Sequence, residues 1–532
     1  MSNQITCGEA TMNLLARYGV TTVFGIPGVH TLDFCRGLDN GGVRHVQTRN
    51  EQGAGFMAEG WARATGEVGV ALVISGPGVT NATTALGQCY ADSLPMLLIS
   101  AEAASNTIGK GWGVLHEVTE QKKVTEPLTG YSATAYRAAD VPEIMARAFA
   151  VLKGGRPRPV HISIPIDVQA EMVDGDWRAL MPADLPPAAE SQIAQAAALL
   201  KSAKNPLIMT GGGASGACVE LTAIAEATGA IVVASTAGKG IVPDNHPLSL
   251  SASTVRPEVQ ALLGEADVIL AVGTELAETD SFVERMDLNG KIIRVDIDPS
   301  KINDFYPAEI GIVADAALAM TVLAAELADH RSENRAAAEA RVTAVRAEIA
   351  GNLTGSERQH VALLDGLRAV APENTIWSGD SCQLVYTGAF AMDVTGPRQW
   401  FYPAGYCALG NALPNGIGAK MARPDRPVAV LAGDGGFMFT MPELVTAAEE
   451  KLALPIIIWE NGGLKQIQDD MDRVSCDRVG VEGINPDFVM LAKACHCHGL
   501  EVSTVEEAQG AFVAALSADR PTVIVFHESP EG

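Results

Sequence analysis

The sequence is poor in basic residues: 38 lysines and arginines stand against 63 aspartates and glutamates, and the formal net charge is −25. A surface of this sign repels phosphate backbones and anionic lipids, so the composition argues against nucleic-acid and membrane partners. The sequence also lacks an apolar run near the roughly 20 residues that a membrane-spanning helix needs. Its first residues, MSNQITCGEATMNLL, show no basic segment followed by an apolar core, so we expect no signal peptide.

Disulfide and zinc signatures are missing as well. The nine cysteines are odd in number, scattered along the chain and without a CxxC pair. This usage is typical of free thiols in a reducing compartment, so we expect a cytoplasmic protein. Cys495, His496, Cys497 and His498 are consecutive, but adjacent side chains on a helix or strand point in different directions and do not close a tetrahedral zinc site.

With 532 residues, of which 47% are hydrophobic and 19% charged, the chain is long enough for about three domains. Short β-rich runs alternate with longer Ala-rich stretches, a pattern typical of α/β domains built on parallel sheets. An acidic, Pro-rich segment at 170–190 predicts a linker, and a helical stretch over 314–350 predicts a second boundary near 353. We therefore predict an α/β protein with three doubly wound parallel-sheet domains, at 1–170, 190–335 and 355–532.

Individual strands can be placed within these domains by their apolar runs. The first domain has predicted strands at 21–27, 69–75, 95–100 and 159–165, with helices at 51–66 and 79–91. Strands are predicted in the second domain at 205–210, 230–235, 268–273 and 291–297, and in the third at 375–379, 427–436, 454–461 and 521–527.

The most informative motif is Gly433-Asp434-Gly435-Gly436, which follows an apolar strand and precedes a predicted helix. A glycine turn at this place exposes backbone N–H groups, which suit a phosphate. A carboxylate beside that phosphate is favourable only with a cation between them, such as Mg²⁺ or Ca²⁺. Asn461 follows the next strand, and the carboxyl ends of parallel strands lie side by side, so Asp434 and Asn461 can meet at one metal ion. The alternative is a turn aspartate and an unrelated loop asparagine.

A GDG turn followed 27 residues later by Asn461 resembles the signature of thiamine diphosphate enzymes. The nearer resemblance is to the branch that contains acetolactate synthase, pyruvate oxidase and the 2-oxoacid decarboxylases, and it extends over essentially the whole chain. It implies a pyrimidine-binding, a central Rossmann-like and a diphosphate-binding domain. It also implies a homodimer or homotetramer whose active sites lie between subunits.

The resemblance assigns ligands for Mg²⁺. Asp434, the Asn461 side chain and the backbone carbonyl of Gly463 match the protein ligands of the metal that holds the diphosphate. The family usually has Asn-Asn where this chain has Glu460-Asn461. The second Asn is the ligand, so we expect metal binding to be retained. The extra carboxylate either repels the diphosphate or favours a cationic substrate.

A second motif, RNEQGA at 49–54, resembles the family's HEQGA or HEGGA stretch, with Asn50 in place of the usual His. Glu51 matches the glutamate that bonds the aminopyrimidine ring and so activates the cofactor, and we predict it to be catalytic. The plain alternative is a carboxylate that only stabilises the N-terminus of a helix. The GDG motif in the same chain favours the catalytic role.

Further stretches match cofactor contacts of the family. SGPGVTN at 75–81 resembles the GPGxxN turn that lines the pyrimidine pocket. GIPGVH at 25–30 matches a loop near the thiazolium ring, but Val29 stands where some decarboxylases carry Asp or Ser, and the role of His30 stays open. Leu409 matches the large apolar residue on which the cofactor bends. The residues so assigned to the cofactor are Pro27, Gly28, Glu51, Gly76, Asn81, Asp380, Ser381, Leu409, Gly433, Asp434, Gly435, Gly436, Asn461 and Leu464.

A second candidate catalytic residue is His116. The stretch GVLHE at 113–117 resembles the VLHH stretch of pyruvate-type decarboxylases, with the second His replaced by Glu117. Imidazole titrates near neutral pH, so a histidine beside the cofactor can return a proton to the substrate carbon after CO₂ leaves. The alternative is a surface or capping histidine.

The central domain carries a weaker motif. GGGASG at 211–216 follows a predicted strand and satisfies GxGxxG, which alone would indicate NAD. The next strand along the chain ends in Ser235-Thr236 and offers no carboxylate for a ribose, so we interpret the glycines as a structural turn. A dinucleotide-dependent oxidoreductase is therefore disfavoured, and FAD is not expected.

We expect decarboxylation of a small 2-oxoacid. The resemblance is nearest to bacterial proteins assigned as 5-guanidino-2-oxopentanoate decarboxylase, which would release 4-guanidinobutanal and CO₂. It rests on the runs at 23–32, 87–100, 113–118 and 466–471. A guanidinium tail would need carboxylates, for which Glu117, Glu460, Asp469 and Asp470 are candidates. The alternatives are an acetolactate synthase-like carboligase, which joins the decarboxylated acid to a second carbonyl compound, and a non-catalytic protein of the same fold.

Overall fold

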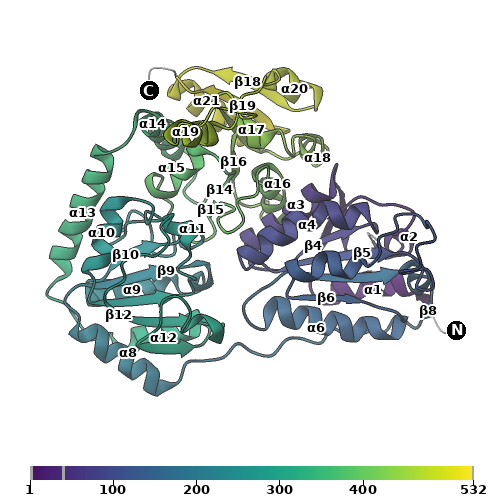
Figure 1. Ribbon diagram of the computed structural model, residues 1–532, viewed down its shortest axis with the longest axis horizontal. Coiled ribbons are helices and arrows are strands. Elements are labelled where there is room, and N and C mark those ends of the chain that lie inside the picture. The colour runs from purple at the N-terminus through teal and green to yellow at the C-terminus, as the bar shows by residue number, and fades with distance from the viewer. Residues whose placement is uncertain (1–3, 39–41, 530–532) are drawn as a thin grey trace.

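Three parallel sheets, each flanked by helices, organise the residues that the computed structural model describes, which are 4–38 and 42–529 (Figure 1). The α/β class with three parallel-sheet domains is thus confirmed. Each sheet lies inside one of the three predicted ranges, whose boundaries stay a prediction. No helix in the described part of the chain is long and apolar enough to cross a membrane.

The first sheet has six parallel strands in the order β3-β2-β4-β5-β7-β6. Its inner strands β4, β5 and β7 are buried along their whole length because helices cover both faces. The strands are β2 (Thr22–Gly25), β3 (Arg44–Gln47), β4 (Gly69–Val73), β5 (Met96–Glu102), β6 (Tyr131–Thr134) and β7 (Val160–Pro165). The main helices are α1 (Cys7–Arg17), α2 (Leu32–Cys35), α3 (Glu51–Thr65), α4 (Pro77–Ala91), α5 (Gln121–Thr125) and α6 (Val141–Lys153).

The central sheet has five parallel strands in the order β10-β9-β11-β12-β13. They are β9 (Pro206–Thr210), β10 (Ile231–Ala234), β11 (Val268–Val272), β12 (Lys291–Asp296) and β13 (Ile310–Val313). The helices are α8 (Glu190–Ser202), α9 (Cys218–Thr228), α10 (Pro257–Glu265), α12 (Ala316–Glu326) and α13 (Arg335–Gly351). Helix α13 runs along the side of this domain towards the third one (Figure 1).

The third sheet has six parallel strands in the order β15-β14-β16-β17-β19-β18. They are β14 (Ile376–Gly379), β15 (Trp400–Phe401), β16 (Val428–Gly433), β17 (Pro455–Glu460), β18 (His498–Val502) and β19 (Thr522–His527). The helices are α14 (Gly355–Val370), α15 (Gln383–Ala391), α16 (Ala412–Ala422), α17 (Asp434–Phe437), α18 (Glu443–Glu449), α19 (Lys465–Arg473), α20 (Phe488–Ala494) and α21 (Val505–Ala515).

The predicted linker contains one short element. Strand β8 (Met172–Val173) pairs antiparallel with β1 (Ile5–Thr6), next to the first residues that the structure describes. Residues 174–189 that follow form no helix or strand. A strand of two residues is too short to show a hydrophobic period, so this pair could not be predicted from the sequence.

The first and third domains share one hydrophobic core, which includes Phe56 of α3 and Ile417 of α16. Two glycines let these helices approach closely. A Cβ atom on Gly60 would lie 2.1 Å from the Asn415 carbonyl oxygen, and one on Gly418 would lie 2.0 Å from that of Met57. The helix that begins with the predicted catalytic Glu51 is therefore packed directly on the third domain (Figure 1).

Candidate active site

Asp434 lies directly after β16, and its side chain is almost fully buried. Its Oδ1 atom accepts the backbone N–H of Gly435 at 2.8 Å, and its Oδ2 atom accepts those of Gly462 and Gly463 at 2.9 Å each. One carboxylate thus joins the ends of the paired strands β16 and β17, and Asn461 is the residue that directly follows β17. A Cβ atom on Gly435 would lie 3.4 Å from the Gly463 carbonyl oxygen, so this oxygen faces the same turn.

Asp380, which follows β14, contacts the same turn. A Cβ atom on Gly436 would lie 3.0 Å from the Asp380 Cγ atom. The Asp380 carboxylate accepts the backbone N–H of Ser381 at 2.8 Å and that of Gly410 at 3.0 Å, and burial raises the pKa of this carboxyl to about 6. Leu409, which is half-buried, precedes Gly410. Asp380, Gly410 and the glycine turn at 433–436 form one corner of the site.

The Leu464 side chain packs on the glycine turn from the other side. A Cβ atom on Gly435 would lie 3.0 Å from its Cδ2 atom. The structure therefore brings together the predicted residues of the diphosphate end, from Asp380 and Leu409 to the GDGG turn and the Asn461 loop.

The groups around this turn fit a divalent cation and a diphosphate. Asp434, Asn461 and Gly463 offer a carboxylate, an amide and a carbonyl oxygen, which are the donor types that Mg²⁺ prefers. The Ser381 hydroxyl and both polar side-chain atoms of Asn411 are buried without a hydrogen-bond partner. Buried polar groups left unpaired are costly, so these atoms favour a polar ligand at this corner.

One residue of this corner was missed by the sequence reasoning. The Asn485 Nδ2 atom donates to Asp434 Oδ2 at 2.7 Å and to Glu460 Oε1 at 3.0 Å. The other oxygen of Glu460 lies 3.3 Å from His527 Nδ1. The Glu460 carboxylate thus has its own partners on both sides. Asn485 lies outside the GDG-to-Asn motif, and no spacing signal points to it.

Glu51 is the first residue of α3 and is 7% exposed. Its Oε2 atom accepts a hydrogen bond from Asn81 Nδ2 at 2.9 Å. Its Oε1 atom lies 3.6 Å from the position that a Cβ atom on Gly78 would take. Asn50 caps the helix by accepting the backbone N–H of Gln52 at 2.8 Å. The two motifs at 49–54 and 75–81 therefore form one site, with Glu51 and Asn81 in direct contact.

A carboxylate from the third domain holds the start of α3. Glu443, which begins α18, is buried, and its Oε1 atom accepts the backbone N–H groups of Arg49 and Asn50, each at 3.0 Å. Burial raises the pKa of the Glu443 carboxyl. The sequence carries no signal for this contact, because the partners are separated by nearly 400 residues.

His116 lies against the turn that carries Gly76. Gly76 has φ +61°, and a Cβ atom there would lie 2.5 Å from the His116 carbonyl oxygen, so only glycine fits. The side chain of Gln121 fixes the turn by accepting the Gly76 N–H at 2.8 Å. His116 Nδ1 is buried without a hydrogen-bond partner. The ring of His30 packs edge-on against that of His116, with centroids 5.0 Å apart.

Pro27 and Gly28 lie in the turn after β2, beside the end of β4. A Cβ atom on Gly28 would lie 2.6 Å from the Ile74 Cγ2 atom, so glycine allows the two strand ends to approach. Pro27 is exposed and Gly28 half-buried. In the described residues, no hydrogen bond or ion pair joins the group around Glu51 to Asp434.

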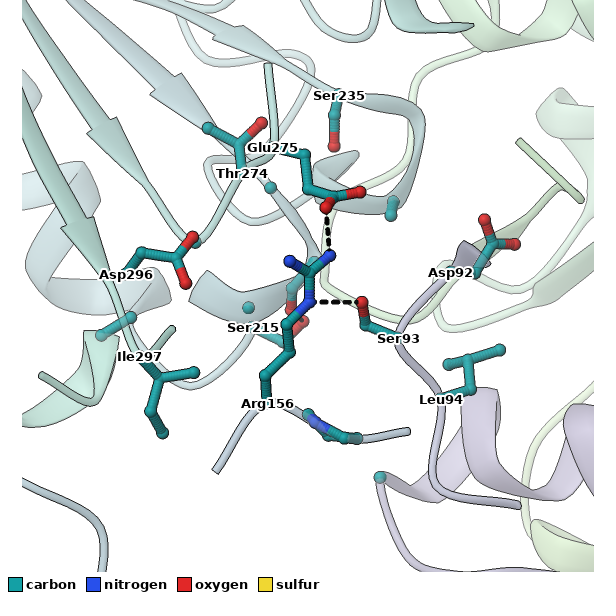
Figure 2. A pocket seen from close by; sticks show the side chains of 18 of the residues that line it. Asp92, Ser93, Leu94, Arg156, Ser215, Ser235, Thr274, Glu275, Asp296 and Ile297 are labelled. Atoms are coloured by element: carbon teal, nitrogen blue, oxygen red, sulfur yellow. Dashed lines mark hydrogen bonds and ion pairs between the residues drawn. The ribbon is translucent and has the colours of Figure 1, made fainter. Parts of the chain in front are cut away.

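The glycines at 211–213 line a cavity of about 480 Å³ between the domains (Figure 2). Arg156 of the first domain enters it, pairs with Glu275 and donates from Nε to Ser93 Oγ at 2.9 Å. Asp296, which ends β12, also lines the cavity, and burial raises the pKa of its carboxyl. Strand β10, the next strand along the chain, is followed by Ser235 and Thr236 and has no carboxylate at its end, as predicted. Asp296 belongs to β12, which lies on the other side of β9 from β10.

Comparison with known proteins agrees with this geometry. The chain matches the N-terminal thiamine pyrophosphate binding domain of thiamine pyrophosphate enzymes over residues 5–124, their central domain over 193–323, and their C-terminal thiamine pyrophosphate binding domain over 380–526.

Curated relatives match nearly the whole chain. A probable 2-ketoarginine decarboxylase, AruI of Pseudomonas aeruginosa, is 46% identical over 524 residues, which cover 98% of this chain and 93% of the relative. The acetolactate synthase large subunit of Corynebacterium glutamicum is 32% identical over 556 residues, covering 98% and 87%. The acetolactate synthase isozyme 3 large subunit of Escherichia coli is 31% identical over 541 residues, which cover 97% of this chain and 93% of that subunit. The chain thus belongs to the thiamine pyrophosphate enzymes.

Proposed function

We propose that the protein decarboxylates 5-guanidino-2-oxopentanoate to 4-guanidinobutanal and CO₂, with thiamine diphosphate and Mg²⁺ as cofactors. The observation that carries the chemistry is that one turn, at 75–81, contacts both Glu51 and His116. The substrate is supported by the 46% identity with a probable 2-ketoarginine decarboxylase.

Each residue has a task in this proposal. Bound thiamine diphosphate supplies the electron sink for the bond that releases CO₂. Asp434, Asn461 and the Gly463 carbonyl hold Mg²⁺. Glu51 bonds the cofactor's aminopyrimidine ring through a carboxyl oxygen, and Asn81 orients that carboxyl. His116 holds the proton that the substrate carbon takes up.

The ion pairs of the structure discriminate among the four acids considered for the guanidinium tail. Glu460 faces His527, Asp469 pairs with Lys465, and Asp470 pairs with Arg473. Glu117 instead accepts the backbone N–H groups of Trp112 and Gly113, at 3.2 and 2.8 Å, and makes no ion pair within the described residues. Its negative charge is free to receive a cation, so we assign the guanidinium to Glu117.

We also propose a homodimer or homotetramer in the cytoplasm. The group around Glu51 and the group around Asp434 belong to opposite ends of one cofactor. Because no hydrogen bond or ion pair joins the two groups within the described residues, a site built between two subunits accounts for both. The nine free cysteines favour a reducing compartment.

The test is a product analysis. The protein is incubated with thiamine diphosphate, Mg²⁺ and a panel of 2-oxoacids, and the products are identified by mass spectrometry. The proposal predicts 4-guanidinobutanal from the guanidino acid and slower turnover of uncharged acids. The second candidate, acetolactate synthase-like carboligation, is favoured by the 32% identity with an acetolactate synthase, and it predicts acyloins instead.

A further inference from the structure

The turn after β2 carries a second histidine into the group around Glu51. His30 is 8% exposed, whereas its neighbour Val29 is 65% exposed. The turn fixes this difference. Thr31 Oγ1 accepts the Gly28 N–H at 3.0 Å, and the Thr31 N–H donates to the Gly28 carbonyl at 2.9 Å. The apolar residue is thereby turned outward and the imidazole inward.

His30 has two partners there. Its Nδ1 atom lies 2.6 Å from the hydroxyl oxygen of Ser75, which is 1% exposed. Its ring meets that of His116 at 5.0 Å between centroids and 72° between planes. Because Ser75 occupies Nδ1, Nε2 is the ring nitrogen of His30 that remains for proton exchange.

The same turn joins this histidine pair to Glu51. Ser75 contacts His30, Gly76 contacts the His116 backbone, and Gly78 lies against the Glu51 carboxyl. Ser75, Gly76 and Gly78, which belong to one short turn, thus set the positions of the two histidines relative to Glu51. A histidine held only by core packing would not need this arrangement.

We propose that His30 is a positioning residue, which shares one proton with His116 while Ser75 holds the His30 ring in place. The inference rests on the proposed function, because it needs a carbon that accepts a proton. When the C–CO₂ bond breaks, its electron pair stays on the substrate carbon, that carbon takes one proton from the pair, and water returns a proton to the pair.

Electrostatics places the proton on one of the two rings. Two imidazolium ions 5.0 Å apart repel each other, so the pair carries a single charge. Burial and the neighbouring His116 both lower the pKa of His30. His30, the more buried ring, is therefore the harder of the two to protonate, and it orients the ring of His116 beside it.

The experiment uses the full-length holoenzyme with His30→Ala, His30→Gln and a control, Leu32→Ala, which changes an exposed side chain close by in the chain. We expect both His30 variants to lose about 10- to 100-fold in kcat, with KM within about twofold of the wild type. Thiamine diphosphate affinity, measured by fluorescence titration, stays unchanged. Added imidazole restores part of the rate of His30→Ala and leaves Leu32→Ala unaffected.

The proposal is overturned if His30→Ala matches Leu32→Ala in kcat. It is also overturned if the loss comes with weaker cofactor binding and no rescue by imidazole, because His30 is then only structural. If His30→Ala does not fold, His30→Gln decides, and an unchanged kcat in that variant contradicts the proposal. A wild-type protein that decarboxylates no 2-oxoacid would instead refute the proposed function.

Discussion

Oε1 of Glu443 lies 3.0 Å from the backbone nitrogen of Asn50, so a carboxylate of the third domain holds the residue before Glu51. A Cβ atom on Gly53 would lie 2.2 Å from the same oxygen, so a larger residue at that position would displace this carboxylate. The position of Glu51 therefore depends on the contact between the first and third domains as well as on helix α3.

Removal of this carboxylate leaves the backbone N–H groups of Arg49 and Asn50, which are partly buried in this contact, without an acceptor. We expect Glu443→Ala to lower the free energy of unfolding by about 1–3 kcal/mol and to reduce kcat. Denaturant unfolding of the purified protein measures the first effect. The control is Glu449→Ala, which breaks a half-exposed ion pair with Arg49 and costs at most about 1 kcal/mol. Equal losses in the two variants would contradict the account.

The pH dependence of stability tests the same contact. Burial raises the folded-state pKa of Glu443 above its unfolded value, so its contribution is fully present below the unfolded pKa and is lost as the pH rises through the folded pKa. The stability of the wild type relative to Glu443→Gln is therefore expected to fall with rising pH above the ordinary glutamate range. Urea unfolding from acidic to neutral pH measures it. A relative stability that rises over this range would refute the assigned direction.

Asn485 separates the Asp434 and Glu460 carboxylates by donating to both. We expect Asn485→Ala to weaken Mg²⁺ binding by about 10- to 100-fold, as is usual when a partner of a metal ligand is lost. Titration of Mg²⁺ into protein with excess thiamine diphosphate, followed by fluorescence, measures the change. Asn289→Ala, whose side chain bonds the Gly264 carbonyl far along the chain, is the control. An affinity unchanged in Asn485→Ala would show that the amide does not support the site.

Glu117→Gln tests the assigned guanidinium acceptor. We expect kcat/KM for 5-guanidino-2-oxopentanoate to fall by about 10- to 100-fold, because a charge-assisted hydrogen bond is lost, while an uncharged 2-oxoacid of the same length is unaffected. Asp470→Asn is the matched control, since its carboxylate pairs with Arg473. If both substrates fall together, Glu117 shapes its loop through Trp112 and Gly113 and does not select the substrate.

The inner strands of all three sheets could be predicted from the sequence. The strands that were missed show where prediction from hydrophobic pattern fails. Strands such as β4 and β16 are continuous apolar runs, because both faces of a parallel sheet are covered. The missed β3, β6, β13, β15 and β18 all lie at sheet edges, and most of them are short or half-exposed. A short edge strand has no apolar run that distinguishes it from a loop.

In the candidate site, too, only part of the residues could be predicted from the sequence. Residues such as Glu51 and Asp434 sit in motifs whose spacing follows from one strand and one turn, so the sequence could indicate them. Asn485 and Glu443 reach the site from distant parts of the chain, and only tertiary packing brings them there. The role of His30 could not be predicted either, because the direction of its ring depends on the turn made by Gly28 and Thr31.

The exchange rate of the thiazolium C2 hydrogen with deuterium, followed by NMR on bound thiamine diphosphate, tests the central claim most directly. The account predicts Mg²⁺-dependent binding and fast exchange in the wild type. In Glu51→Gln it predicts retained binding and exchange slowed by at least about 100-fold, because the acid that activates the cofactor is gone. Equal exchange rates in the two proteins, or no binding of the cofactor by the wild type, would contradict it.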